Sequence, residues 1–335
     1  VRVNFLGPVQ FNPSQTEFCD NSPTFNLDGV SPVGGTFSGA GVTGSKFDPQ
    51  AAGVGSHSIT YTYVLGGCVK TRRRTFKVKA APQATLSTNI SNVVTFQGEN
   101  VYTKCFPSNG TFAFFSTSPT SEYSKVYLNY GDGSPLDSAT NLSIGNAKSH
   151  TFQEGLYTVT ARFVNDTGCI KVSRIKVFFG STPQGGISSY GSTQGCVPSD
   201  GSGLTYAFAI NNTLNNPPGT IYKVTFSNDS VTRVYTHPPP DTIYQTFYKS
   251  SCGYTSVLNE NNTFSGSLIV VNPCDSLPGN IGGIKISESP VANFNAEDTC
   301  VGDSVKLTGL SIGGKLQFSN CDTVEKIIWD INPKQ

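Results

Sequence analysis

Residues 127–137, YLNYGDGSPLD, place an aromatic strand directly before a turn rich in glycine and aspartate. A calcium loop of the EF-hand type needs acidic oxygens at several alternating positions and a final glutamate, but this stretch offers only Asp132 and Asp137. A tight turn needs a residue that hydrogen-bonds its own backbone and glycines that adopt positive φ, and Gly131-Asp132-Gly133 supplies both. The stretch therefore predicts a strand followed by a turn. The alternative is an isolated structural calcium ion at a domain joint.

Strands of the same kind recur along the chain. Apolar residues alternate with threonine or other polar residues in SITYTYVL (58–65), LYTVTARFV (156–164), YAFAI (206–210) and YKVTF (222–226). This alternation is typical of a sheet with one buried and one solvated face. No amphipathic helix of ten or more residues is evident. The fold class predicted is all-β.

Composition agrees with this class and limits the partners. Only 13% of the 335 residues are charged, while Gly (35) and Pro (20) are abundant, which favours short strands joined by turns. A formal net charge of +1 gives no overall field for steering nucleic acid. No apolar run approaches the roughly 20 residues of a membrane-spanning helix. We therefore expect neither nucleic-acid binding nor membrane insertion.

Proline-bearing segments divide the chain into four units. KAAPQATL (79–86), GSTPQGG (180–186) and SESPVANF (287–294) separate residues 1–81, 82–181, 182–288 and 289–335. Proline at these joints is expected to stiffen the connections. Residues 127–134 align with 223–230, and Ile327–Asp330 begins the same strand in the fourth unit. A period near 100 residues predicts tandem sandwiches rather than a solenoid.

Both ends of the sequence suggest a segment of a longer chain. Val1 follows neither an initiator methionine nor a signal sequence. The fourth unit stops after roughly half of the ~100 residues that such a domain needs. We expect it to be the start of a further, truncated domain.

Nine cysteines are present without any C-x-x-C pair, and the three histidines lie far apart, so a zinc site is not expected. Disulfides in an oxidising compartment are the better interpretation. The expected bridges, each within one unit, are Cys19–Cys68, Cys105–Cys169, Cys252–Cys274 and Cys300–Cys321. Cys196 is then left over, although it could replace either neighbour in its unit, because connectivity does not follow from sequence.

The second unit resembles the PKD domain, an Ig-like β-sandwich. The resemblance rests on an aromatic strand that runs into G-D-G-S and on a following H-x-F-x-x-x-G-x-Y-x-V; the residues that carry it are Tyr130, Gly131, Asp132, Gly133, Ser134, His150, Phe152, Gly155, Tyr157 and Val159. The tryptophan usual in that strand is replaced here by Tyr127 or Leu128, while Trp329 occupies the corresponding place in the fourth unit. The third unit departs further, with Ser-Asn-Asp-Ser in the turn.

The first unit, through CDNSPTFNLDGV (19–30) and GGCVKTRRRTFKV (66–78), resembles an Ig-like repeat of very large secreted surface proteins of the Bacteroidetes. Such arrays are typical of type IX secretion cargo, including adhesins of gliding motility. The resemblance implies an elongated array of Ig-like and PKD-like sandwiches at the cell surface, attached to the outer membrane. Its partners would be further domains of the same chain, the secretion and surface-attachment machinery, and a polysaccharide or solid surface.

Three other features look chemical and are interpreted as structural. Gly39, Gly41 and Gly44 match G-x-G-x-x-G, but no helix follows, so we expect a loop packed against its own sheet. Arg72-Arg73-Arg74 is expected to be a solvated strand lying beyond the edge of the core. His150 is expected to pack or hydrogen-bond structurally, and His57 and His237 to be loop or edge residues. No catalytic residue, cofactor or metal site is assigned, and we expect no enzyme.

A short D-[ST]-apolar motif recurs that resembles O-glycosylation sites of exported Bacteroidetes proteins. The residues that would carry the glycan are Ser138, Ser230, Thr242, Ser276, Ser304 and Thr323. A glycan coat would protect exposed β-edges from pairing and proteolysis.

The function predicted is that of a structural or adhesive stalk in bacterial surface adhesion or gliding. The alternative is a carbohydrate-binding or accessory array of a secreted hydrolase. A linear cluster of exposed aromatic residues on one sheet face would favour that alternative, because sugars stack on such platforms.

Overall fold

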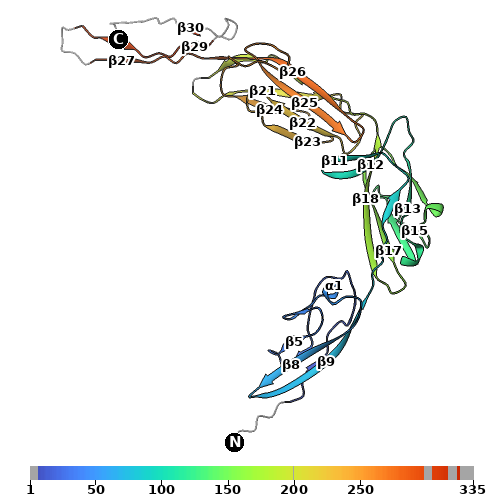
Figure 1. Ribbon diagram of the computed structural model, residues 1–335. Coiled ribbons are helices and arrows are strands. Elements are labelled where there is room, and N and C mark those ends of the chain that lie inside the picture. Colours follow the sequence, from blue (N-terminus) through green and yellow to red (C-terminus); the bar gives the residue numbers. More distant parts are fainter. Residues whose placement is uncertain (1–6, 199, 298–303, 316–322, 325–335) are drawn as a thin grey trace. The chain divides into compact units, whose positions relative to one another are not determined.

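The computed structural model describes residues 7–198, 200–297, 304–315 and 323–324 (Figure 1). These residues form an all-β protein, as predicted from the alternation of apolar and polar residues. The helices within the described ranges are the four-residue α1 (Pro49–Ala52) and the 3-10 turns η1 (Thr120–Glu122) and η2 (Ile144–Asn146). Asp48 starts α1 by accepting hydrogen bonds from the backbone N–H groups of Gln50 and Ala51.

The chain divides into two compact units, each built from more than one stretch of sequence. Unit 1 comprises residues 1–93, 111–152 and 157–177. Unit 2 comprises residues 94–110, 153–156 and 178–335. The predicted boundaries at 81/82, 181/182 and 288/289 remain a prediction.

Unit 1 holds most strands of the first half of the chain. They are β1 (Gln10–Phe11), β2 (Glu17–Cys19), β3 (Phe25–Asn26), β4 (Val30–Ser31), β5 (Thr36–Ser38), β6 (Val42–Thr43), β7 (Lys46–Phe47), β8 (Gly55–Leu65), β9 (Cys68–Lys79), β10 (Leu86–Thr88), β13 (Thr111–Ser116), β14 (Lys125–Asn129), β15 (Asp137–Ala139), β16 (Lys148–Thr151), β17 (Gly155–Val164) and most of β18 (Ile170–Gly180).

Two sheets enclose the first core. One has the order β2-β9-β8-β5, with β2 parallel to β9, and the other has the order β3-β7-β6. The core is rich in phenylalanine; its buried members are Phe11, Phe18, Leu27, Phe47, Ile59, Tyr61, Phe76 and Val78. The β8–β9 hairpin extends past this core, so Leu65 is exposed although its parity matches that of Ile59 (Figure 1).

The second pair of sheets contains residues 127–137, the aromatic strand and its glycine-rich turn. One sheet has the order β10-β13-β16, and β18-β17-β14-β15 are neighbours in the other. Val159, Ala161 and Phe163 of β17 are fully buried, as their alternation with threonine and arginine predicts.

Unit 2 holds the remaining strands. They are β11 (Val93–Phe96), β12 (Glu99–Cys105), β19 (Gly186–Ser189), β20 (Gln194–Val197), β21 (Leu204–Asn211), β22 (Ile221–Phe226), β23 (Thr232–Thr236), β24 (Ile243–Phe247), β25 (Phe264–Asn272), β26 (Asp275–Glu288), β27 (Phe294–Ala296), β28 (Leu307–Gly309), β29 (Gly314–Lys315) and β30 (Thr323–Val324).

Strand pairing in unit 2 repeats that of the second pair of sheets. The central strand β22 lies between β23 and β25, just as β14 lies between β15 and β17. The three-stranded sheet β19-β21-β24 corresponds in the same way to β10-β13-β16. The sequence alignment of residues 127–134 with 223–230 is therefore matched by the topology, while residues 327–330 lie outside the described ranges.

Candidate functional site

The turn at residues 130–134 is built as the sequence predicts. Gly131 and Gly133 both have positive φ (81° and 85°). Oδ1 of Asp132 accepts hydrogen bonds from the backbone N–H of Ser134 (3.0 Å) and from its hydroxyl (2.6 Å). Asp132 thus closes the turn with its own side chain, and its Oδ1 is occupied by protein donors.

The other carboxylate oxygen of Asp132 reaches β16. His150 Nε2 lies 2.6 Å from Asp132 Oδ2, and since a carboxylate only accepts, the imidazole N–H donates. The imidazole stacks on Tyr130, with ring centroids 3.8 Å apart and planes 6° apart. Phe152 meets His150 edge-on at 4.7 Å. His150 therefore both packs and hydrogen-bonds, as expected.

Electrostatics in this cluster follow from burial and from these hydrogen bonds. Burial by itself raises the pKa of Asp132, but the hydrogen bonds from Ser134 and His150 outweigh it and lower the pKa to about 2. Burial is also the main cause that raises the pKa of Tyr130, followed by the charge of Asp137, which accepts the Tyr130 hydroxyl at 3.2 Å. Asp137 in turn pairs with Lys148.

A structural calcium ion, the alternative for this stretch, finds no ligand set here. The oxygens of Asp132 and Asp137 accept hydrogen bonds from serine, histidine, tyrosine and lysine. Across the described ranges, no three His, Cys, Asp or Glu side chains gather closely enough to hold a metal ion.

A disulfide between Cys19 and Cys169 marks the first joint. Its cysteines are 150 residues apart and belong to the predicted units 1–81 and 82–181. Around it the side chain of Asp20 accepts from the Ala81 N–H (2.9 Å), and Asn165 Nδ2 donates to the Ala80 carbonyl (2.8 Å). Asn21 Nδ2 donates to the Ile170 carbonyl (2.8 Å). The joint is thus held by a covalent bond and by hydrogen bonds to the connecting backbone.

A second disulfide, Cys105–Cys274, lies in unit 2 and joins cysteines of the predicted units 82–181 and 182–288. An apolar cluster lies beside it, formed by Phe96, Val101, Leu156, Phe178, Ile221, Val271 and Cys274. Asn272 Nδ2 donates to the carbonyl of Ser181 in the connecting segment (3.0 Å). The prolines of the two connecting segments, Pro82 and Pro183, are both buried. Neither connection is a solvated linker.

Three of the four predicted disulfide pairs are wrong. Cys19 lies opposite Lys79, at one end of the twelve-residue β9, and Cys68 lies at the other end, roughly 35 Å away at 3.3 Å per residue. A disulfide requires Cα atoms within about 7 Å, so the Cys19–Cys68 bridge cannot form.

Cys105–Cys169 is excluded because each partner is bonded elsewhere, and Cys252–Cys274 because Cys274 is bonded to Cys105. Cys252 is itself disulfide-bonded. Cys68 and Cys196 are exposed and take part in neither bridge. Cys300 and Cys321 lie outside the described residues. The bridges indicate an oxidising, extracellular compartment.

The predicted glycosylation residues occupy varied environments. Ser138 and Ser276 lie at exposed positions of β15 and β26, and Ser230 lies in a turn with positive φ. Thr242 directly precedes β24 and is half-buried, Ser304 is exposed, and Thr323 belongs to β30. Their modification remains a prediction.

The G-x-G-x-x-G match is a packed loop, as predicted. A Cβ on Gly39 would lie 2.7 Å from Ile59 Cδ1, and one on Gly41 would lie 2.5 Å from the carbonyl oxygen of Asp48. Gly44 adopts positive φ in the turn.

The basic run Arg72–Arg74 and the histidines His57 and His237 lie on or beside strands. Arg72 and Arg73 are exposed on β9, as predicted, and Arg74 donates to Asn12. The run does not lie beyond the edge of the core, because Arg72 and Arg74 pair with the buried core residues Tyr61 and Ile59. His57 Nε2 lies 2.7 Å from the carbonyl oxygen of Gly53. His237 Nδ1 lies 3.0 Å from the Tyr222 hydroxyl, and burial lowers the pKa of His237.

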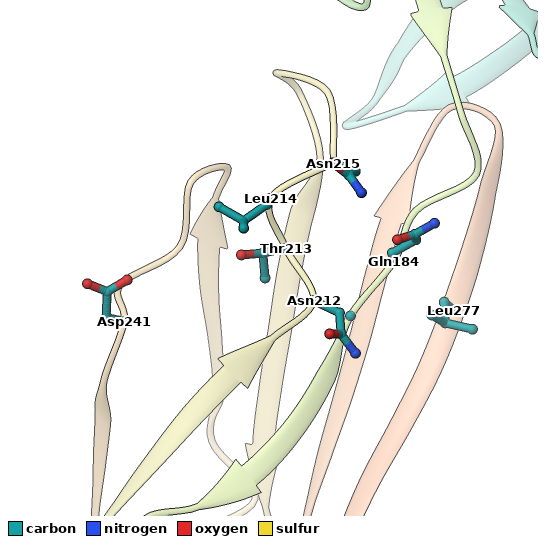
Figure 2. A pocket seen from close by; sticks show the side chains of 8 residues that line it. Gln184, Asn212, Thr213, Leu214, Asn215, Asp241 and Leu277 are labelled. Atoms are coloured by element: carbon teal, nitrogen blue, oxygen red, sulfur yellow. The ribbon is translucent and has the colours of Figure 1, made fainter.

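An open hollow of about 610 Å³ lies at one end of the sheets of unit 2 (Figure 2). Side chains from the loop after β21, from the segment before β19 and from β26 surround it. The lining residues are Gln184, Gly185, Asn212, Thr213, Leu214, Asn215, Asp241 and Leu277. Behind them, the buried Asn216 fixes the loop by donating to the Gln184 carbonyl and to the Tyr222 hydroxyl, both at 2.6 Å.

Sequence reasoning missed this hollow and the polar residues at the first joint. The polar residues at the joint lie close in sequence to a cysteine: Asp20 and Asn21 follow Cys19, and Asn165 lies four residues before Cys169. This proximity was the signal from which they could have been predicted. The loop NNTLNN (211–216) was a weaker signal for the hollow, because it places an apolar residue among amide side chains at the end of a strand.

No known protein family matches the chain, and no curated protein does. Among solved structures, the fibronectin(III)-like modules of CbhA from Clostridium thermocellum are 14% identical, with 60% of this chain and 95% of that chain covered and a TM-score of 0.26. A Ca²⁺-stabilized adhesin that helps an Antarctic bacterium reach out and bind ice is 12% identical (92% and 82% covered, TM-score 0.24). A two-domain fibronectin type III segment of chicken tenascin is 13% identical (52% and 93% covered, TM-score 0.25). At these identities and TM-scores the likeness does not extend to a ligand, partner or activity.

The longest helix in the described part of the chain is α1, so no helix there has the length and apolar character needed to span a bilayer.

Proposed function

We propose that this chain is a load-bearing segment of a large secreted cell-surface protein, a stalk of β-sandwich repeats that serves bacterial adhesion or gliding motility. The observation that carries the proposal is the placement of the two bridges. Each joins a cysteine of one predicted unit to a cysteine of the next, so covalent bonds reinforce the connections through which tension would pass.

The connecting segments support the same role. A flexible linker would expose its backbone to water, whereas Ala81, Pro82 and Ala84 are buried in the first connection. The Cys19–Cys169 and Cys105–Cys274 bridges limit how far each connection can open. No catalytic step is part of the proposal. Export through a type IX system rests on the sequence resemblance and on the D-[ST]-apolar motifs.

The test uses cells that display the complete parent protein. Cys169→Ser and Cys274→Ser each remove one bridge, and Cys196→Ser is the matched control because Cys196 takes part in neither bridge. We expect the two bridge variants to reach the surface, as measured by antibody labelling, but to detach under shear that wild-type and control cells withstand. Normal attachment and spreading after deletion of the parent gene would overturn the adhesive role.

A further inference from the structure

Exposed tyrosines gather on one face of one sheet. All 14 tyrosines of the chain lie in the described residues, and the three that are mostly exposed are Tyr190 (59%), Tyr244 (68%) and Tyr248 (68%). Each belongs to the sheet β19-β21-β24 or directly continues one of its strands. An exposed tyrosine ring does not gain the free energy of burial that it would gain in a core or an interface. Three such rings on one face therefore indicate a contact surface.

The pairing register places two of these rings across a small residue. Tyr244 lies directly opposite Ala207, and on the other side of Ala207 the Tyr190 N–H donates to the Ala207 carbonyl at 3.0 Å. Directly opposed residues of antiparallel strands share a face. The two tyrosines therefore flank Ala207 on the outer face, about 10 Å apart at two strand spacings.

Tyr248 extends the same face, because it follows Tyr244 by four residues and side chains alternate with period two. A Cβ on Gly203 would lie 2.9 Å from two carbons of the Tyr248 ring, so the ring rests on the bare glycine backbone. One side of the ring is supported in this way, and the other is open to solvent. Such a ring is a preformed platform that loses little conformational freedom on binding.

The amide-lined hollow adjoins this face. The Tyr190 hydroxyl donates to the carbonyl oxygen of Asp241, which lines the hollow, at 3.3 Å. Figure 2 shows Asn212, Thr213 and Asn215 on one loop, with the exposed Leu214 between them. Amides and hydroxyls both donate and accept hydrogen bonds, as sugar hydroxyls do. Aspartate is the only charged residue in the lining, and no lysine or arginine is part of it.

We propose that the outer face of β19-β21-β24, together with the hollow beside it, binds a neutral polysaccharide. Tyrosine rings stack on the apolar faces of sugars, while the amide groups hydrogen-bond their hydroxyls. The charges around the site disfavour an anionic polysaccharide. The hollow contains the carboxylate of Asp241, which would repel it. The ammonium group of Lys249, the residue after Tyr248, lies over the Tyr254 ring. This role is separate from load bearing and gives one module of the stalk a ligand of its own.

The experiment is affinity electrophoresis of the complete chain in gels that contain hydroxyethyl cellulose, xylan or galactomannan, with alginate as the anionic comparison. Intact mass first establishes that Thr242, on the same face, carries no glycan. We expect at least one neutral polysaccharide to retard the wild type. The double variant Tyr190→Thr/Tyr244→Thr keeps residues that suit strands, and its association constant should fall at least about tenfold.

Two further variants make the result specific. Tyr244→Phe keeps the ring and should retain most of the binding. Val234→Ala removes an exposed apolar side chain from β23, in the other sheet, and should bind as the wild type does. Absence of retardation by all three neutral polysaccharides would overturn the proposal, and so would unchanged binding by the double variant. Self-association that the tyrosine variants abolish, without polysaccharide binding, would make this face a contact between copies instead.

Discussion

The carboxylate of Asp132 and the imidazole of His150 meet at 2.6 Å and tie the turn after β14 to strand β16. These elements belong to different sheets of the second sandwich. The pair is therefore a polar link between the two layers, beside the ion pair of Lys148 in β16 with Asp137 in β15.

Loss of the Asp132 carboxylate should destabilise this sandwich and change its acid response. Asp132→Asn weakens charge-assisted hydrogen bonds and is expected to cost about 2 kcal/mol at neutral pH. Because folding lowers the pKa of Asp132 from 3.8 to about 2, its extra stabilisation is complete above pH 4 and is lost as the pH falls towards 2. Calorimetric melting between pH 2 and 7 should show a flatter profile for the variant. Asp166→Asn, at an exposed position, is the control and should follow the wild type.

Two glycines of one turn should differ sharply in their tolerance of alanine. Gly131 and Gly133 have nearly the same positive φ, so a methyl group imposes similar backbone strain of about 1–2 kcal/mol at each. At Gly131 the new Cβ would also lie 2.6 Å from the Thr158 carbonyl oxygen, whereas at Gly133 nothing lies within 4 Å. Gly131→Ala should therefore lower the melting temperature clearly more than Gly133→Ala. Equal losses would contradict the close approach of β17 to the turn.

Peptide mapping without reduction should recover the two long-range bridges. We expect cross-linked peptides that contain Cys19 with Cys169 and Cys105 with Cys274, and none that join Cys19 to Cys68. Loops of this length predict a stabilisation of about 5 kcal/mol for each bridge. Cys169→Ser should accordingly melt well below Cys196→Ser. A Cys19–Cys68 peptide would contradict the structure.

Pulling the unfolded chain by handles placed just before Cys19 and just after Cys274 should distinguish the two long-range bridges from local ones. With both intact, the shortest covalent path from Cys19 to Cys274 runs through the 64 residues that separate Cys105 from Cys169. Reduction restores the full separation of 255 residues between positions 19 and 274. The extra contour length, about 190 residues, is on the order of 650 Å at 3.3–3.6 Å per residue. Single-molecule extension with and without reductant measures this difference. A change of only about 135 residues would instead indicate the local pairs Cys19–Cys68, Cys105–Cys169 and Cys252–Cys274.

The strands were predictable because their signal is local. Alternation identified Val159, Ala161 and Phe163 as buried, and the G-D-G-S turn followed from residues that supply positive φ and a side-chain acceptor. Alternation alone could not show where a core ends. Leu65 has the parity of a core residue but lies on the part of β8 that extends past the sheets.

The bridges and the tyrosine face were not predictable in the same way. Cysteines adjacent in sequence were paired, whereas the true partners meet because β2 runs parallel to β9 and so brings Cys19 to the connection after Lys79. No local pattern encodes that approach. The tyrosines depend on register: IYQTFY (243–248) alternates buried Ile243 and Phe247 with exposed Tyr244 and Tyr248, but only the pairing with β21 shows that Tyr190 joins them.

The order of the cysteines along the chain also determines what a single proteolytic cut can achieve. Any single backbone cut between Cys19 and Cys274 falls inside the loop closed by Cys19–Cys169, inside the one closed by Cys105–Cys274, or inside both. The two fragments would then stay covalently joined. A nicked chain would stay in one covalent piece, so cleavage in an exposed turn would not separate its two ends.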